Sequence, residues 1–307
     1  MSFFPGNDPT LGNSAEVDAI EQLIIPRTSD IGSMEVRRAL PSARRRLVGP
    51  FIFFDRMGPA LLRAGQAMEV RPHPHIGLST VTYLFDGQIK HRDSLGVEMV
   101  IEPGDVNLMT AGRGIVHSER SPENLAGKEH SISGLQTWLA LPDGMEEIDP
   151  KFSHIDRGEM PQFEASGVNG RLIIGNMEGM RSPVNLPTET LYLDIRLQPG
   201  ATFQMKPEWE ERAVYVLEGG VTAGGTWYEP DQLLVLKAGV PVEFTAGREA
   251  THLMFFGGDA MDSQRYIWWN FVSSSKERIE QAKEEWRTGK FDIVPGDEED
   301  FIPLPEG

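Results

Sequence analysis

Two stretches of the chain repeat the same pattern of strand residues and turn residues. The segment TVTYLFDG (80–87) aligns with RAVYVLEG (212–219) at an offset of 132. In the same order, EPGDVNLMTAG (102–112) aligns with EPDQLLVLKAG (229–239) at an offset of 127. The smaller second offset corresponds to a shorter hairpin in the second copy, because loops tolerate deletions. The chain is therefore expected to fold into two similar domains.

The segments between the predicted turns are typical of β-strands. Stretches such as LYLDIRLQPG, QLLVLKAG and THLMFFGG are rich in β-branched, aromatic and other apolar residues and end at Pro or Gly. This pattern indicates an all-β sandwich or barrel. The length of 307 residues suits two domains of ordinary size, which we place at residues 1–150 and 151–307.

The composition excludes several kinds of site. Cysteine is absent, so disulfides, thiolate metal sites and cysteine nucleophiles are excluded, and any metal must be held by nitrogen and oxygen ligands. The formal net charge of −17 disfavours direct binding to nucleic acid. The N-terminal stretch (1–26) lacks the basic start and apolar run of a signal peptide, and no later stretch has the roughly 20 apolar residues of a membrane-spanning helix. We therefore expect a cytoplasmic protein that does not bind membranes.

A cluster of arginines near the N-terminus is an exception to this acidic character. The cluster could hold an acidic ligand, but salt bridges to the many carboxylates of the chain are the favoured interpretation. Its members are Arg37, Arg38, Arg44, Arg45 and Arg46.

Two pairs of potential metal ligands stand two residues apart in strand-like segments. His73 and His75 lie in RPHPHIGL, and His117 and Glu119 lie in AGRGIVHSER. Since side chains i and i+2 of a β-strand point the same way, each pair can direct both of its groups at one point. A single strand histidine is more often structural, but two such pairs in a cysteine-free β-protein favour a metal site. The spacing therefore predicts one metal ion bound by three imidazoles and one carboxylate.

The repeat provides an internal control for this prediction. Shifting the first pair by 132 residues gives Met205 and Pro207, and shifting the second pair by 127 gives Phe244 and Ala246. These side chains offer nothing to a hard cation, so the second copy is expected to lack a metal and to carry apolar filler at the ligand positions. Because the strand pattern persists there without the ligands, the histidines are not required by the architecture.

One amphipathic helix is predicted near the C-terminus. The segment SSSKERIEQAKEEWRTGK places Ser274 three residues before Glu277, which is the spacing of a capping box, and it stops at Gly289. An acidic, proline-containing tail follows and is expected to run over the surface. The aromatic run YIWWNF (266–271) is expected to pack between a domain and this helix.

The remaining histidines are not assigned to the metal site. His91 follows a predicted turn and is expected to be a hydrogen-bonding loop residue instead of a fifth ligand. His130, His154 and His252 are isolated in the sequence and are given no chemical role.

The motifs resemble those of the pirin family, whose members are bicupins. The resemblance extends from about residue 20 to the end and lies in HPHIGLSTVTYLFDG, HRDSLG, PGDVNLMTAGRGIVHSE, VGPFIFFDRMGP and NFVSSSKERIEQAKEEW. It implies an all-β fold of two tandem cupin β-barrels with a C-terminal helix and tail. It also implies that one metal, usually iron, binds in the N-terminal cupin while the second cupin is empty. The implied ligands are His73, His75, His117 and Glu119.

Two positions depart from the family pattern. Ser79 stands where relatives often carry Glu, and Arg56 stands where they often carry His. Both are expected near the pocket, where they would affect substrate preference.

Iron(II) is the favoured metal, although nitrogen and oxygen ligands also suit Mn, Co, Ni, Cu and Zn. A six-coordinate ion with four protein ligands keeps two positions open, whereas a tetrahedral zinc would be saturated. The resemblance implies an oxidoreductase of the quercetin 2,3-dioxygenase type that acts on a flavonol-like or enediol-like substrate with dioxygen, and Glu119 would serve as the catalytic base. The alternative is a non-enzymatic regulator in which the redox state of the iron changes the affinity for a protein partner. In either case we expect a monomer.

Overall fold

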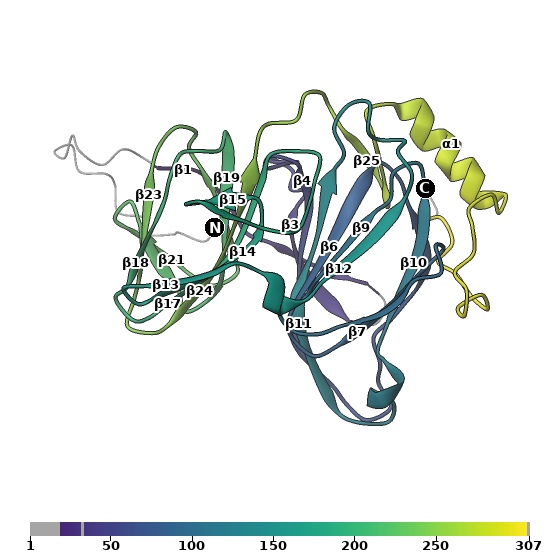
Figure 1. The fold of residues 1–307 in the computed structure, drawn as a ribbon, viewed down its shortest axis with the longest axis horizontal. Coiled ribbons are helices and arrows are strands. Elements are labelled where there is room, and N and C mark those ends of the chain that lie inside the picture. The colour runs from purple at the N-terminus through teal and green to yellow at the C-terminus, as the bar shows by residue number, and fades with distance from the viewer. Residues whose placement is uncertain (1–18, 32–33, 306–307) are drawn as a thin grey trace, which may run out of the picture.

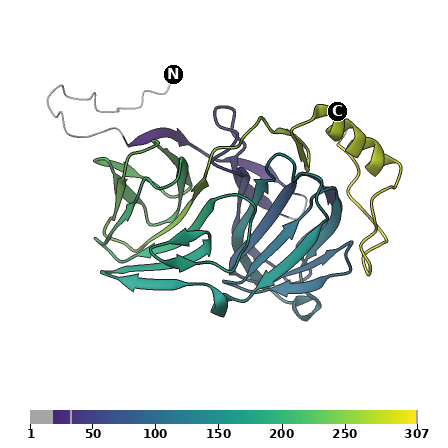
Figure 2. The same cartoon turned by 45° about the horizontal axis from the view of Figure 1, so that its top comes forward.

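The two copies of the sequence repeat form the centres of two β-lobes that lie side by side (Figure 1). The computed structural model describes residues 19–31 and 34–305. Most of the N-terminal stretch that was compared with a signal peptide lies outside these residues. Figure 2 shows the same two lobes, with the C-terminal helix on the outer flank of the first lobe.

The first lobe is a barrel made of a seven-stranded sheet and a four-stranded sheet. In spatial order the larger sheet contains β12 (Lys151–Ile155), β9 (Val106–Thr110), β6 (Leu78–Asp86), β11 (His130–Ala140), β4 (Phe51–Leu62), β3 (Glu35–Leu40) and β2 (Arg27–Asp30). The smaller sheet contains β5 (Glu69–His75), β10 (Ile115–Arg120), β7 (Ile89–Asp93) and β8 (Glu98–Ile101).

The second lobe repeats this arrangement with its own seven-stranded and four-stranded sheets. The larger sheet contains β1 (Ile20–Ile24), β22 (Gln232–Leu236), β19 (Glu211–Glu218), β24 (Thr251–Gly258), β17 (Thr190–Leu197), β14 (Val168–Ile174) and β13 (Gln162–Ala165). The smaller sheet contains β18 (Thr202–Met205), β23 (Val242–Ala246), β20 (Val221–Ala223) and β21 (Thr226–Tyr228). The short hairpins are β15 (Asn176–Met177) with β16 (Met180–Arg181), and β25 (Tyr266–Trp268) with β26 (Phe271–Ser273).

Strand pairing confirms the repeat residue by residue. Tyr83 of β6 lies opposite Val106 of β9, and Tyr215 of β19 lies opposite Leu233 of β22. The turn that follows each tyrosine strand carries a glycine at the same place, and both glycines have a positive φ, +83° at Gly87 and +82° in the second copy. A Cβ on Gly87 would meet a backbone carbonyl oxygen at 2.3 Å, so only glycine fits. The all-β prediction is confirmed.

The two seven-stranded sheets pack against each other through one face each. Phe54 of the first barrel stacks on Tyr215 of the second with ring centroids 5.0 Å apart, and Phe51 contacts Tyr192 edge to face at 5.4 Å. Both sides belong to one buried apolar cluster. Because strand side chains alternate between faces, the residues next to these aromatic anchors point into the barrel interiors. In the first barrel this alternation directs a set of polar and aromatic side chains toward the histidine-bearing sheet.

Two segments cross between the lobes, whereas β12 stays with the first barrel. β1 precedes the first barrel in sequence but pairs with β22 of the second, and β12 follows the first barrel and pairs with its β9. Near the C-terminus, Phe271 of β26 bridges to Ile76, so the end of the chain returns to the first barrel. The expected packing of the aromatic run 266–271 against the helix is confirmed by the shared cluster of Phe271, Ile279 and Ala282.

The predicted helix exists as α1 (Lys276–Arg287), but its N-terminal cap is not the predicted one. Ser275 is the N-cap, and its Oγ accepts the backbone N–H of Arg278 at 3.2 Å. Ser274 instead donates its backbone N–H and its hydroxyl to Glu146, which removes its oxygen from the helix end. The stop at Gly289, with φ +67°, is confirmed. Within the described ranges, no helix is long and apolar enough to cross a membrane.

Three of the five clustered arginines form salt bridges, as the favoured interpretation predicted. Arg37 pairs with Asp231 and Arg45 with Glu211, both carboxylates of the second lobe. Arg38 pairs with Asp55 on the neighbouring strand β4.

Candidate metal centre

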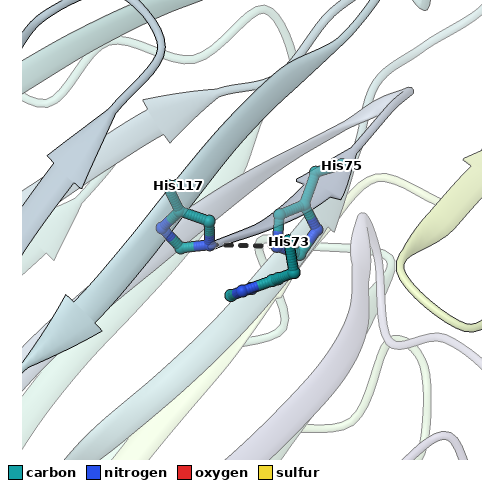
Figure 3. Close-up of side chains that lie close together, drawn as sticks. All are labelled: His73, His75 and His117. Carbon is teal, nitrogen blue, oxygen red and sulfur yellow. Dashed lines mark hydrogen bonds between the residues drawn. The ribbon is translucent and has the colours of Figure 1, made fainter. Parts of the chain in front are cut away.

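Strands β5 and β10 bring three of the four predicted ligands together. The two strands pair antiparallel with His73 opposite His117, and the alternation of β5 places His75 on the same face as His73. All three side chains are buried, and one ring nitrogen from each lies within 4.8 Å of the others. His75 Nε2 and His117 Nε2 are 3.1 Å apart (Figure 3). Two nitrogens bound at right angles to one metal at ~2.1 Å would be about 3.0 Å apart, so the spacing fits a shared ion.

Hydrogen bonds fix which nitrogen of His73 carries the proton. Its Nδ1 lies 2.8 Å from the carbonyl oxygen of Arg71. A carbonyl oxygen only accepts, so Nδ1 must be the protonated nitrogen and Nε2 keeps its lone pair. The backbone of β5 itself therefore prepares this imidazole as a ligand.

A hydrogen-bonded series of His117, His91 and Asp93 likewise determines which nitrogen of His117 carries the proton. His117 Nδ1 lies 3.4 Å from His91 Nδ1, and His91 Nε2 lies 3.0 Å from Asp93 Oδ2. Asp93 is fully buried, and its other oxygen accepts the backbone N–H groups of Leu95 and Val97. A carboxylate accepts from His91 Nε2, so His91 Nδ1 accepts from His117 Nδ1. The lone pair of His117 Nε2 is thereby directed to the site.

The three imidazoles are neutral in this setting. Burial lowers the pKa of His73 to about 4 and lowers the pKa values of His75 and His117 well below the ordinary value. A metal competes with protons for imidazole nitrogen, so low pKa values keep the three lone pairs available at neutral pH. His75 Nε2 and His117 Nε2 face each other at 3.1 Å, close to the separation of two nitrogens that bind one ion at right angles. The donor set therefore fits a transition-metal ion.

Glu119 lies beside this cluster and is not part of the group of three. The pairing of β10 with β5 shifts by one residue between His117 and Glu119, so the carboxylate enters the same pocket from a displaced position. Its Oε1 lies 3.4 Å from Thr82 Oγ1 and 3.4 Å from Gln136 Nε2. Burial raises the pKa of Glu119.

The cluster opens into a pocket of about 410 Å³, within the usual size of a small-molecule site. His73, His75 and Glu119 line it together with side chains of the opposite sheet. The C-terminal part of the chain contributes Trp269, Asn270 and Ile302. The remaining lining residues are Asp30, Ile31, Val36, Arg38, Phe53, Asp55, Met57, Met68, Val70, Gln136 and Trp138.

Three expectations from the sequence require correction here. His91 is not a loop residue: it lies in β7, is buried, and stacks on Phe152 with centroids 4.6 Å apart, although the expected hydrogen bonding is present. Ser79 and Arg56 do not line the pocket, because each sits on the opposite face of its strand. Ser79 bonds Thr110, and Arg56 reaches the second lobe at the carbonyl oxygen of Leu217.

The histidines that received no role lie in separate places. His130 bonds Ser121, His154 bonds Asn107, and His252 bonds the buried Asp194 at 2.7 Å. Sequence reasoning missed the link from Asp93 to His117, yet its signal was present. His91 and Asp93 are spaced by two in a strand, as the ligands are.

The second barrel has apolar side chains at the corresponding positions. Phe203 lies opposite Phe244, as His73 lies opposite His117, and Met205 follows at the position of His75. The register therefore moves both predicted counterparts by two residues, from Met205 and Pro207 to Phe203 and Met205, because the connection that follows the strand is longer in the second copy. Met205, Phe244 and Ala246 are buried in one apolar cluster, which confirms the expected packing.

Comparison with known proteins identifies both halves of the chain. The family model described as Pirin matches residues 33–139, and the model described as Pirin C-terminal cupin domain matches residues 192–292. A pirin-like protein of Caulobacter vibrioides is 46% identical over 94% of this chain and 100% of its own length. A putative quercetin 2,3-dioxygenase of Pseudomonas aeruginosa is 35% identical over 92% of this chain and 90% of its own length.

Solved structures agree with this relationship. A crystal structure named quercetin 2,3-dioxygenase from Acinetobacter baumannii has a TM-score of 0.86 and 32% identity, and it covers 93% of this chain and 95% of that one. The bacterial pirin YhhW of Escherichia coli, whose structure is described as a complex with nickel(II), shares the fold at a TM-score of 0.62 and 18% identity, over 78% of this chain and 99% of its own. With both family models matched in chain order and a relative matched over its whole length, the chain belongs to the pirin family and is a bicupin.

Proposed function

We propose that the chain is a metal-dependent oxidoreductase of the quercetin 2,3-dioxygenase type that acts at one Fe(II) ion in the first barrel. The observation that carries the proposal is the convergence of neutral, buried imidazole nitrogens on a pocket of small-molecule size. The relatives that bear the name quercetin 2,3-dioxygenase support the reaction class.

His73, His75 and His117 would hold the ion, with Glu119 as the fourth ligand from the neighbouring position on β10. When bound, a six-coordinate Fe(II) would keep two positions open, which suit either the two vicinal oxygens of a flavonol-like or enediol-like substrate or dioxygen. Three neutral imidazoles and one carboxylate would leave Fe(II) with a net charge of about +1, so the site favours a substrate whose hydroxyl has lost its proton.

Glu119 is the residue suited to accept that proton. It is buried in the pocket beside the histidines, and burial raises its pKa, which makes the ionised carboxylate a stronger base. Gln136 Nε2 lies 3.4 Å from its Oε1 and orients it without neutralising its charge, and Thr82 Oγ1 holds Gln136 by donating to its Oε1 at 2.7 Å.

Oxygen consumption tests the proposal. Metal-free protein is loaded with Fe(II) under nitrogen, and oxygen uptake is followed after addition of quercetin. Glu119→Gln should retain metal but reduce the rate by about 100-fold or more, the usual contribution of a general base. Glu129→Gln, which changes an exposed carboxylate, is the matched control and should behave as the parent.

A flat oxygen trace with iron-loaded parent protein and several flavonols would contradict the dioxygenase proposal. In that case the regulator remains, with binding of a protein partner that differs between Fe(II) and Fe(III). If Glu119→Gln turns over the substrate at the rate of the parent, the reaction class stands but Glu119 is not the base.

A further inference from the structure

The pocket wall opposite the histidine-bearing strands contains two parallel rows of side chains. The polar row crosses four neighbouring strands, and each member lies opposite the next in the strand register. Its members are, in order, Thr82 (β6), Gln136 (β11), Asp55 (β4) and Arg38 (β3). In the aromatic row, two residues along the same strands, Trp138 faces Phe53. A spacing of two keeps both rows on one face of the sheet. Gln136, Asp55, Arg38 and both aromatic residues line the pocket.

The guanidinium of Arg38 is held in one place at the end of the polar row. Its Nε and one terminal nitrogen donate to the two oxygens of Asp55 at 2.8 and 2.7 Å. Its central carbon lies 4.4 Å from the ring centroid of Phe53. A bidentate carboxylate contact combined with ring stacking fixes the plane of the group before any ligand arrives. Arg38 is thus preorganised.

The aromatic row connects this group to the metal centre. Trp138 contacts the ring of His75 edge to face at 5.0 Å and stacks on Phe53 at 3.9 Å. Because β4 lies between β11 and β3, Trp138 contacts the ring of Phe53 from the side of β11, and Arg38 contacts it from the side of β3. Arg38 lies two strands from Trp138, which is about 10 Å at the usual strand spacing. A ligand bound at the histidines must extend along this wall to reach Arg38.

The ion pair of Arg38 and Asp55 determines which kind of ligand group can bind beside it. Two of the five guanidinium N–H groups of Arg38 go to Asp55, and the other three have no hydrogen-bond partner within the described part of the chain. A ligand carboxylate would be repelled by Asp55, and a ligand cation would be repelled by Arg38. A neutral hydroxyl on an aromatic ring avoids both penalties and accepts a hydrogen bond from the guanidinium. Phe53 and Trp138, which line the pocket, favour aromatic contact with such a ring.

We propose that Arg38 determines substrate specificity by donating a hydrogen bond to a hydroxyl on the ring of the substrate that lies farthest from the metal. The choice of a flavonol as substrate rests on the proposed function, but the binding preference does not require turnover. The substrate class is therefore a planar polyphenol with a chelating oxygen pair at one end and a ring hydroxyl at the other.

The test compares binding of two flavonols to protein loaded with Ni(II) under nitrogen, followed by quenching of tryptophan fluorescence. Quercetin carries hydroxyls on its pendant ring, and galangin has the same chelating oxygens with an unsubstituted pendant ring. The parent should prefer quercetin by about tenfold or more, the usual contribution of a hydrogen bond to a charged group. The double variant Arg38→Met with Asp55→Asn should bind the two equally and galangin with unchanged affinity.

The double change is chosen because Arg38→Met alone would leave Asp55 buried without a partner and could unfold the barrel. Arg38→Lys is a milder variant that keeps the positive charge, and it should also lower the ratio because lysine lacks the planar fork. Arg37→Met is the matched control, since Arg37 is the next residue on β3, points to the other face and is half exposed. It should retain the parental preference.

Any of three results would overturn the proposal. The parent could bind both flavonols equally, a folded double variant could keep the preference for quercetin, or the protein could bind no flavonol at all. Preferential quercetin binding together with a flat oxygen trace would refute the dioxygenase function and leave the specificity role of Arg38 intact.

Discussion

Replacing Asp93 by Asn is predicted to weaken metal binding while leaving the shape of the site unchanged. Asp93 Oδ1 accepts two backbone N–H groups, so the amide oxygen of an asparagine must occupy that position. The amide nitrogen then faces His91 Nε2 and donates to it, which reverses the proton positions along the chain. His91 Nδ1 would donate to His117 Nδ1, and His117 would carry its proton on Nε2, the nitrogen that faces the metal.

The size of the effect follows from the role of such partners in metal sites. Loss of a group that orients a ligating histidine costs 10-fold to 100-fold in metal affinity, which is about 1.4–2.7 kcal/mol of binding free energy. Isothermal titration of Ni(II) into metal-free protein measures this change. Nitrogen NMR of the histidine side chains should show the His117 proton on Nδ1 in the parent and on Nε2 in the variant.

Two controls separate the tautomer effect from a folding defect. Asp149→Asn changes an exposed carboxylate and should leave metal affinity unchanged. His91→Gln keeps an acceptor for His117 Nδ1 and should retain more affinity than His91→Phe, which keeps only the stacking on Phe152. If Asp93→Asn binds Ni(II) within twofold of the parent, the proposed proton chain is wrong.

Two further predictions concern the ligands and the contact between the lobes. His117→Ala should empty the metal site, measured by metal analysis, without unfolding the chain, because the second barrel is built without metal ligands; full metal occupancy would contradict the ligand assignment. Burial raises the pKa of Asp194, but His252 and Tyr83 outweigh burial and hold it below 3.8. The carboxylate therefore stabilises the fold above that pH, and the difference in Tm between the parent and Asp194→Asn should shrink as the pH falls below about 3.8. A difference that is constant from pH 6 to pH 3 would refute this.

The parts of the structure that depend on local sequence were predictable. Strand alternation is a property of a few consecutive residues, so the two-residue spacing within each pair, His73 with His75 and His117 with Glu119, predicted the site before the fold was known. The repeat revealed two barrels because each copy must bury the same faces. The helix was found from its pattern, while its cap was misplaced by one residue because Glu146, distant in sequence, binds Ser274.

The parts that depend on distant pairing were not predictable. Arg38 appeared as one member of an arginine cluster, and only the register of β3 with β4 places it over Phe53 and beside Asp55. The crossing of β1 into the second barrel also leaves no local signal. The displacement of Glu119 from the histidines arises from a register shift between β10 and β5, which the two-residue spacing conceals.

Anomalous scattering from crystals of the metal-loaded protein tests the central claim most directly. The account predicts one strong peak per chain, about 2.0–2.3 Å from Nε2 of His73, His75 and His117 and from a carboxylate oxygen of Glu119. It predicts no peak in the second barrel, where Phe203, Met205 and Phe244 occupy the corresponding positions. A peak away from the three histidines, or a second peak of equal height between β18 and β23, would contradict the account.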